Sequence, residues 1–371
     1  MKLDSGKVYC LPDMYEVHDK SLQDIQYVLN PTYTEAEVAS TTTDDSWSRA
    51  LHGVEYMPGL IGLNNMKAND YANVVFQALN RIDPLRCFFL SADTYKDVRS
   101  PVVQRWGELE RKMWNAKAFK GHVSPHEIMQ SIMGASQKKF LIDAQSDVVD
   151  FFSWFVNSLH EGLTGGKRRK PSPVTAALQG ELEVVTLAGS GKAKESVVDI
   201  TDRLPFIMLS LDLPPAPLYK DNLERVMIPQ VPIFELLRKY NGVNIHDDMR
   251  MGRRKMKITR LPKYLVLHVK RFLKNQFFVE KNPTIVNFPV KGLNLAEIIP
   301  VPSADNAVYD LVANIVHEGK AGEGTYKVHV LRTSEGLWYE VQDLTVTEVL
   351  PQVVTLSEAY LQIYKLRPRT S

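Results

Sequence analysis

The stretch NNMKANDYANVVFQALNRI, residues 64–82, has the pattern of a polar loop followed by a buried helix. Its apolar side chains recur every three or four residues, which is the stripe of a helix that faces a core. They are Tyr71, Val74, Val75, Ala78 and Leu79. The polar run before this stripe ends at Asp70, where the helix should begin. A helix N-terminus lowers the pKa of a thiol placed there, so it is a common position for a cysteine nucleophile. Here that position holds a carboxylate, and the stretch predicts a catalytic type of helix without its nucleophile.

The composition of the 371-residue chain is ordinary for a globular protein, with 44% hydrophobic and 24% charged residues. A net charge of +2 gives no overall attraction to nucleic acid or acidic membranes, so such a partner would need a local patch. Cys10 and Cys87 are the two cysteines, too few for a disulfide framework or a four-cysteine zinc site. No apolar run approaches the roughly 18 residues of a membrane span. We therefore expect no membrane partner, and a reducing compartment, cytosol or nucleus.

The pattern of polar and apolar residues changes along the chain and divides it into three parts. Residues 1–30 read as the C-terminal remnant of an upstream domain, and residues 31–55 read as a polar linker. Residues 56–371 begin with helical patterns, and from about residue 174 β-branched alternation predicts an antiparallel sheet. Helices first and strands afterwards are typical of an α+β protein.

Four segments match, in order, the sequence boxes of the ubiquitin-specific proteases, so the chain resembles that family. They are GLNNMKANDYANVVFQAL (62–79), QSDVVDFF (145–152), LPKYLVLHVKRF (261–272) and YDLVANIVHEGKAGEGTYKVHVL (309–331) followed by WYEVQD (338–343). The resemblance implies a papain-like ubiquitin-specific protease fold with a helical thumb, a β palm and β fingers. It also implies fingers without a zinc site, because the corresponding stretches contain no cysteine.

The same resemblance locates the catalytic positions, and three of them are changed. Asp70 stands in place of the cysteine, Thr325 in place of the histidine, and Gln342 in place of the first of two paired aspartates. Asn65 matches the oxyanion-stabilising asparagine, and Asp343 matches the second aspartate. A carboxylate that attacked an amide would give a less stable anhydride, and a threonine cannot carry protons near neutral pH.

The sequence therefore predicts a pseudoenzyme in which the helix that begins at Asp70 has only a structural role. In that case Asn69 or Asp70 would cap the helix, a contribution of roughly 1 kcal/mol.

Four further positions resemble the groove in which the family holds the ubiquitin tail. They are Asp147, Asp150, His317 and Tyr326. These groups could bind ubiquitin or a related modifier, or they could serve only to join helix and strand. A ubiquitin reader is therefore an alternative function, and a deubiquitinase with a non-standard active site is a second one.

The N-terminal stretch YCLPDMYEVHDKSLQDIQYVLNPTYT (residues 9–34) narrows the resemblance to one branch of the family. It resembles the end of a ubiquitin-binding type of zinc finger in the spliceosomal, tri-snRNP-associated branch. This implies a nuclear, non-catalytic scaffold in pre-mRNA splicing, with tri-snRNP proteins as partners. No cofactor is expected in this chain, since the zinc would belong to the missing upstream finger.

Two basic segments could contact RNA, and the sequence alone does not decide whether they do. Residues 167–170 read KRRK, which suits a nuclear import signal, a phosphate contact or a solvated loop. Ten lysines and arginines lie between Arg250 and Lys274, several at alternate positions, so they could form one basic face of a hairpin. No aromatic stacking platform accompanies them.

Overall fold

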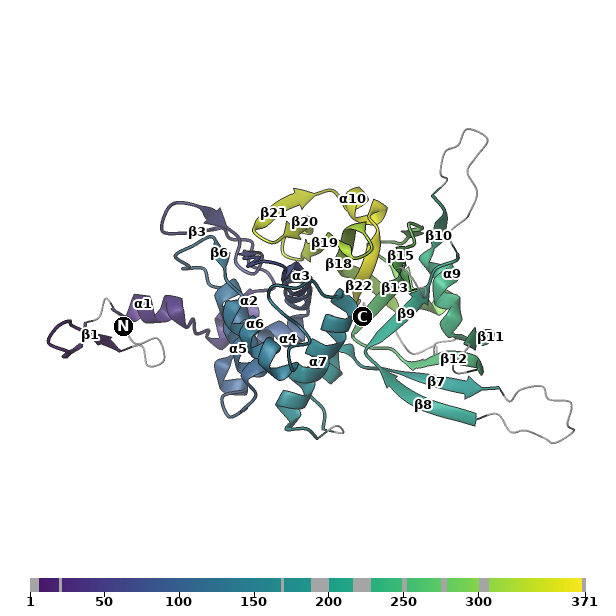
Figure 1. Cartoon of the computed structure of the whole chain (residues 1–371), viewed down its shortest axis with the longest axis horizontal. Coiled ribbons are helices and arrows are strands. Elements are labelled where there is room, and N and C mark those ends of the chain that lie inside the picture. Colours follow the sequence, from purple (N-terminus) through teal and green to yellow (C-terminus); the bar gives the residue numbers. More distant parts are fainter. Residues whose placement is uncertain are drawn as a thin grey trace, which may run out of the picture. The chain divides into compact units, whose positions relative to one another are not determined.

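The computed structural model describes residues 7–19, 22–167, 170–187, 200–215, 228–248, 252–274, 279–299 and 307–368. Its contacts divide the chain into two compact units. Unit 1 comprises Met1–Lys170, Arg332–Gly336 and Val341–Val346, and unit 2 comprises Pro171–Leu331, Leu337–Glu340 and Thr347–Ser371. Most helices lie in the first of these and most strands in the second (Figure 1), which confirms the predicted α+β class.

Unit 1 is built from helices joined by short strand pairs. Its helices are α1 (Leu22–Leu29), α2 (Glu35–Ser40), α3 (Asp70–Leu79), α4 (Asp83–Leu90), η1 (Ala92–Thr94), α5 (Pro101–Met113), α6 (His126–Ala135) and α7 (Val148–Thr164). Its strands are β1 (Val8–Tyr9), β2 (Glu16–Val17), β3 (Ser48–Arg49), β4 (Glu55–Tyr56), β5 (Gly62–Leu63) and β6 (His122–Val123).

The helix predicted from residues 64–82 is α3, which begins at Asp70 as expected. Every one of its residues is buried, because α7 packs against it and Trp106 of α5 contacts Phe76. The ring of Tyr71 lies edge-on to Phe151 at 5.2 Å, and Phe76 lies 5.4 Å from both Trp106 and Phe155. Such aromatic pairs stabilise a core beyond the area they bury. Helix α3 is thus the central element of the unit 1 core.

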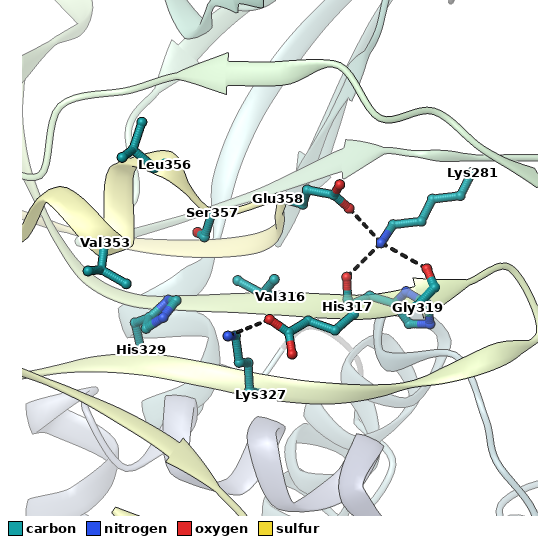
Figure 2. A pocket seen from close by; sticks show the side chains of 11 residues that line it. Lys281, Val316, His317, Gly319, Lys327, His329, Val353, Leu356, Ser357 and Glu358 are labelled. Carbon is teal, nitrogen blue, oxygen red and sulfur yellow. Dashed lines mark hydrogen bonds and ion pairs between the residues drawn. The ribbon is translucent and has the colours of Figure 1, made fainter. Parts of the chain in front are cut away.

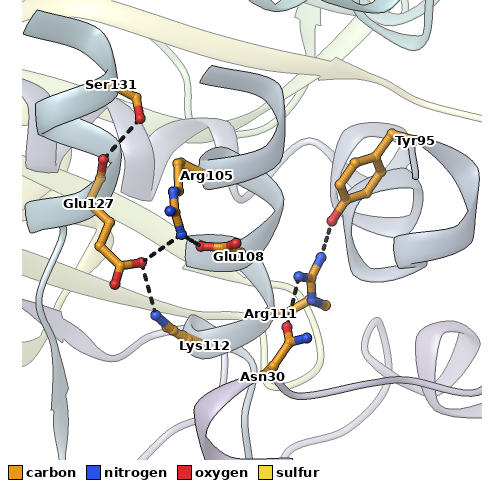
Figure 3. A network of polar contacts seen from close by, with 8 residues as sticks. All are labelled: Asn30, Tyr95, Arg105, Glu108, Arg111, Lys112, Glu127 and Ser131. Atoms are coloured by element: carbon orange, nitrogen blue, oxygen red, sulfur yellow. Dashed lines mark hydrogen bonds and ion pairs between the residues drawn. The ribbon is translucent and has the colours of Figure 1, made fainter. Parts of the chain in front are cut away.

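The segment 31–55, predicted to be a linker, is folded. Helix α2 has a capping box in which Thr34 and Glu37 bond each other's backbone amides. The Tyr33 hydroxyl donates to the carbonyl of Arg111 on α5 at 2.8 Å. The Arg111 guanidinium donates to Asn30, just before the segment, at 3.1 Å (Figure 3). These bonds attach the segment to α5, while the division into domains at residues 30 and 55 stays a prediction.

Unit 2 contains two main sheets. The larger has the order β21-β20-β19-β18-β22-β13-β9, and β17 pairs with β18; the smaller has the order β11-β12-β7-β8. Its elements are α8 (Pro173–Leu178), β7 (Gly180–Thr186), β8 (Ile200–Phe206), β9 (Met208–Asp212), β10 (Gln230–Pro232), α9 (Ile233–Leu237), η2 (Arg238–Tyr240), β11 (Asn241–Asp248), β12 (Gly252–Arg260), β13 (Tyr264–Lys270), β14 (Phe272–Lys274), β15 (Val279–Lys281), β16 (Ile285–Asn287), β17 (Leu293–Asn294), η3 (Leu295–Glu297), β18 (Val308–Lys320), β19 (Glu323–Arg332), β20 (Leu337–Gln342), β21 (Thr345–Val349), α10 (Pro351–Leu356) and β22 (Ala359–Leu366).

The larger sheet corrects one expectation. We predicted an antiparallel sheet, but β9 and β13 run parallel, with Val266 opposite Met208 and Lys270 opposite Asp212. Local alternation of side chains cannot reveal strand direction, because both kinds of ladder have the same period of two.

The smaller sheet takes the place of the predicted fingers and is antiparallel throughout. In this sheet β12 pairs with β7, so that Ile258 lies opposite Leu182, and Ile258 is buried in the unit 2 core. Strand pairing and packing therefore form this sheet, as expected.

The basic segment 250–274 is less uniform than predicted. Arg271 is fully buried and donates to the carbonyls of Ala359, Asn282 and Thr284 at 2.6, 3.2 and 2.6 Å. Lys270 pairs with Asp212 at 2.8 Å. Positions 250 and 251, like 168 and 169 of the KRRK run, lie outside the described residues. A single basic face over the whole segment is therefore wrong, and contact with RNA stays a prediction.

Candidate functional site

Asp70 occupies the first turn of α3, where the sequence places the family's nucleophile. Its side chain is only 3% exposed, and one carboxylate oxygen accepts a hydrogen bond of 3.1 Å from the Gln145 amide. Gln145 lies just before α7, so the bond links the start of α3 to the loop that leads into α7. The position thus holds a side chain that joins two parts of the unit 1 core.

Asn69 corrects the predicted cap. It stands at the N-cap position of α3, but its side chain makes no capping bond. Its backbone angles, φ −103° and ψ 17°, differ from the extended form that usually aims an N-cap side chain at the first turn. Instead its side-chain oxygen accepts from the Met66 amide at 2.7 Å, and its amide group donates to Asn64 and Asn73 at 3.2 and 3.1 Å. Asn69 therefore fixes the loop before the helix.

Asn65, the predicted oxyanion residue, is bonded to Asp343. Its amide nitrogen donates to the Asp343 carboxylate at 3.0 Å, and Asn73 donates to the same carboxylate at 2.8 Å. The Leu63 amide donates to the Asp343 carbonyl at 2.9 Å. Because the Asp343 carboxylate faces the Asn65 amide, an oxyanion that formed there would meet a like charge. Gln342, the preceding residue, ends β20 and is half-buried.

In unit 2, Thr325 lies on β19 opposite Glu318 and is exposed. His317 and Tyr326 face each other across β18 and β19, and both are almost fully buried. Their ring centres are 5.0 Å apart, and Phe272 lies edge-on to His317, also at 5.0 Å. A side chain at Gly324 would come within 2.6 Å of the His317 ring, so glycine is required there. The two predicted groove residues therefore belong to one packed aromatic cluster.

The two predicted acidic groove residues differ from each other. Asp147 is the N-cap of α7, and its carboxylate accepts from the backbone amides of Val149 and Asp150 at 2.7 and 3.1 Å. Asp150 is exposed, and its carboxylate is 3.8 Å from the Lys139 ammonium. Asp147 has a structural use that the box resemblance did not reveal, whereas Asp150 faces solvent.

A pocket of about 520 Å³ opens beside β18, between this strand and α10 (Figure 2). Lys281 lies on one wall and donates to Glu358 at 2.5 Å and to the carbonyls of His317 and Gly319 at 2.7 and 3.3 Å. Lys327 lies between Glu318 and Glu340 at 2.5 and 3.0 Å. Both ammonium groups are thus engaged within the protein. The histidine box contains the pocket residues of β18 and β19, such as His317 and Lys327, but no box contains Lys281 or the pocket residues of α10.

His329 lines the same pocket and is fully buried. Its ring contacts the Glu340 carboxylate at 3.1 Å and the Asn314 amide at 3.4 Å. Burial lowers the pKa of His329 below its usual value, against the opposing effect of Glu340. Because the Glu340 carboxylate can only accept, the Nε2–H of His329 donates a hydrogen bond to it. The Nδ1 of the neutral ring then accepts from the Asn314 amide, and the two bonds hold the imidazole in one orientation. His329 is therefore not free to act as a base in this pocket.

Among the described residues, no three His, Cys, Asp or Glu side chains are grouped so that they could hold a metal ion. Within that part of the chain there is also no helix both long and apolar enough to span a membrane. The absence of a cofactor stays a prediction.

Unit 1 has the buried helix α3 in its core, and the larger sheet contains β18 and β19, the strands of the family's histidine box. These features are those of the ubiquitin-specific protease fold. The chain belongs to the ubiquitin carboxyl-terminal hydrolase family, whose profile matches residues 61–364.

The chain is similar to two proteins of known sequence and to one solved structure, as follows. "Ubiquitin carboxyl-terminal hydrolase 39" of Homo sapiens is 47% identical over 395 residues, spanning 99% of this chain and 69% of the relative. "Probable mRNA-splicing protein ubp10" of Schizosaccharomyces pombe is 38% identical, over 97% of this chain and 75% of that protein. A structure described as "Crystal structure of an essential yeast splicing factor" shares the fold, with a TM-score of 0.78, 23% identity, and coverage of 99% and 84%.

Proposed function

We propose that this protein is a non-catalytic, protease-like scaffold in pre-mRNA splicing, which supports assembly or stability of the tri-snRNP through protein contacts. One observation carries the non-catalytic part. Asp70 occupies the nucleophile position as a buried carboxylate that accepts a bond from Gln145. A carboxylate that attacked an amide would form an anhydride less stable than the amide, so Asp70 cannot replace the thiolate in acyl transfer.

The other catalytic positions support the same proposal. Thr325 offers a hydroxyl where the family has an imidazole, and the Asn65 amide donates to Asp343. The chain's two cysteines are elsewhere, Cys10 near the N-terminus and Cys87, half-buried, on α4. General base, nucleophile and oxyanion stabilisation, which the reaction needs together, are each altered.

The splicing part rests on the relatives' names. The Schizosaccharomyces pombe relative is described as an mRNA-splicing protein, and it matches nearly the whole chain. A role in splicing implies a nuclear location and spliceosomal partners, among which we propose tri-snRNP proteins.

Hydrolysis of a fluorogenic ubiquitin C-terminal substrate tests the non-catalytic part. We expect purified protein to release no fluorophore above the buffer blank, while an active ubiquitin-specific protease serves as a positive control. Turnover that disappears in Asp70→Ala would show that the proposal is wrong.

Affinity purification from nuclear extract tests the scaffold part. Tagged protein should recover tri-snRNP proteins and their snRNAs, and the amount recovered should be the same for Asp70→Ala. Recovery of no snRNP component would contradict the proposal, whatever the result of the hydrolysis assay.

A ubiquitin reader has less support. Three of the four predicted groove residues have structural uses, since Asp147 caps α7 and His317 packs against Tyr326. Titration of labelled ubiquitin against the full chain distinguishes this function, because a reader would bind saturably and a scaffold of the proposed kind would not.

A further inference from the structure

Unit 1 exposes an apolar surface that the proposed function does not use. Leu51 and Val54 lie at the turn between β3 and β4, and Phe119 lies in the segment between α5 and β6. Their side chains are 72%, 58% and 43% exposed. We call these three residues the hairpin patch. Large apolar side chains grouped at the surface are typical of an interaction site.

The hairpin patch is held together by the backbone. The Leu51 amide donates to the Phe119 carbonyl at 3.1 Å, which attaches the hairpin turn to the other segment. Val54 lies against the backbone of Gly121, where an added Cβ would come within 3.0 Å of it. The patch is therefore formed by two segments in direct contact, not by scattered residues.

The buried Tyr56 fixes the segment between α5 and β6 that contains Phe119. Its buried hydroxyl donates to the Asn115 carbonyl at 2.9 Å and accepts from the Ala118 amide at 2.8 Å. The Asn115 side chain also accepts from the Lys117 amide at 2.8 Å. These bonds set the backbone that leads into Phe119. A surface formed in advance loses little entropy when a partner binds.

The charges around the patch favour a partner with carboxylates. Lys117 and Lys120 flank Phe119 and are exposed, and the charge of Lys117 helps to lower the pKa of the Glu37 carboxyl. Lys117 also lies 5.5 Å from the Tyr27 ring. Arg49 and Glu55, across the hairpin, neutralise each other at 2.7 Å. The charge beside the apolar surface is therefore positive on balance, with the ammonium groups of Lys117 and Lys120 against the carboxylate of Glu37.

We propose that the hairpin patch docks an acidic, apolar peptide segment of a partner protein. Its apolar side chains cover Leu51, Val54 and Phe119, and its carboxylates face Lys117 and Lys120. Protein is favoured over nucleic acid because the aliphatic side chains of Leu51 and Val54 offer nothing to a phosphate backbone. The proposal does not depend on the scaffold function, since an active hydrolase could use the same surface.

A random-peptide phage library selected on the full chain tests the proposal. We expect enriched peptides to combine Leu, Ile, Phe or Trp with an excess of Asp and Glu. A synthetic copy of an enriched peptide, followed by fluorescence anisotropy, should bind about tenfold more weakly to Leu51→Ser/Val54→Ser. Lys117→Gln/Lys120→Gln should weaken binding several-fold, and this loss should shrink at high salt because surface charges are screened.

The exposed residues allow matched controls. Leu204→Ser, at a 49% exposed position on β8, should leave peptide affinity unchanged. Unaltered thermal unfolding should show that each variant is folded. Selected peptides without acidic residues, or with full affinity for both double variants, would overturn the proposal. So would dimerisation in the ultracentrifuge that Leu51→Ser abolishes, or displacement of the peptide by polyuridine.

Discussion

Asn73 on α3 donates a hydrogen bond of 2.8 Å to the carboxylate of Asp343, 270 residues further along the chain. Asp343 has a φ of +51°, in the left-handed region that disfavours most side chains. It keeps this conformation while its carboxylate accepts from Asn65 and Asn73 and its carbonyl accepts from Leu63. The family's second aspartate therefore connects the loop before α3 with the turn after β20.

Replacement of Asp343 separates the effect of the carboxylate from that of the backbone. Asp343→Ala should lower the free energy of unfolding by about 2–4 kcal/mol, because it removes the acceptor of the shortest hydrogen bond of the buried Asn73 amide and keeps the strained φ. Asp343→Gly should cost about 1 kcal/mol less, since glycine adopts positive φ freely. Urea unfolding measures both values. Equal losses for the two variants would show that the backbone carries no strain.

Two substitutions of Asp147 test whether this residue is structural or belongs to a binding groove. Asp147→Ala removes the cap of α7 and should cost about 1 kcal/mol in urea unfolding. Asp147→Ser keeps a capping oxygen and should retain most of the stability. If Ser cost as much as Ala, the carboxylate would have to act through something other than the cap.

Restoring the sulfur alone should not restore catalysis. Asp70→Cys places a thiol at the start of α3, but the hydroxyl of Thr325 cannot take its proton near neutral pH. We expect the fluorogenic ubiquitin substrate to stay intact, as with the matched variant Asp70→Ala. Turnover by Asp70→Cys would reveal a proton acceptor at some other position.

Glu110 should make stability depend on pH. It is fully buried on α5, and burial raises its pKa to about 8, although Arg86 and Arg81 oppose the shift. Between the ordinary pKa of 4.5 and about 8, the folded state holds a proton that the unfolded state has released. Stability should therefore fall as pH rises through this window, by up to about 1.4 kcal/mol per pH unit, and level off above it.

Glu110→Gln provides the control, because an amide does not titrate. Urea unfolding at several pH values should show a shallower decline for this variant than for the unaltered protein. Parallel pH profiles would mean that Glu110 is ionised in the folded state at neutral pH.

The sequence predicted the elements that have a strong local period. The stripe of Tyr71, Val74 and Leu79 indicated α3 and its start at Asp70. Periodicity depends only on neighbouring residues, so it can be read from the chain directly. The order of boxes likewise identified the family that the profile match shows.

The sequence could not predict contacts between distant segments. It suggested Asn69 as a cap, whereas its side chain bonds Met66, Asn64 and Asn73. It counted Arg271 in a basic surface, whereas three carbonyls surround it in the core. In both cases the choice of partner depends on which backbone groups are left without a bond after folding.

By itself, the sequence determined which chemical groups the protein has: a carboxylate at position 70, a hydroxyl at position 325, and no cysteine or histidine at either. Only the tertiary structure decided what those groups contact, such as Asp70 with Gln145 and Asn65 with Asp343. The physical reason is that residue type is covalent, whereas hydrogen bonds and burial arise when segments far apart in the chain exclude water together.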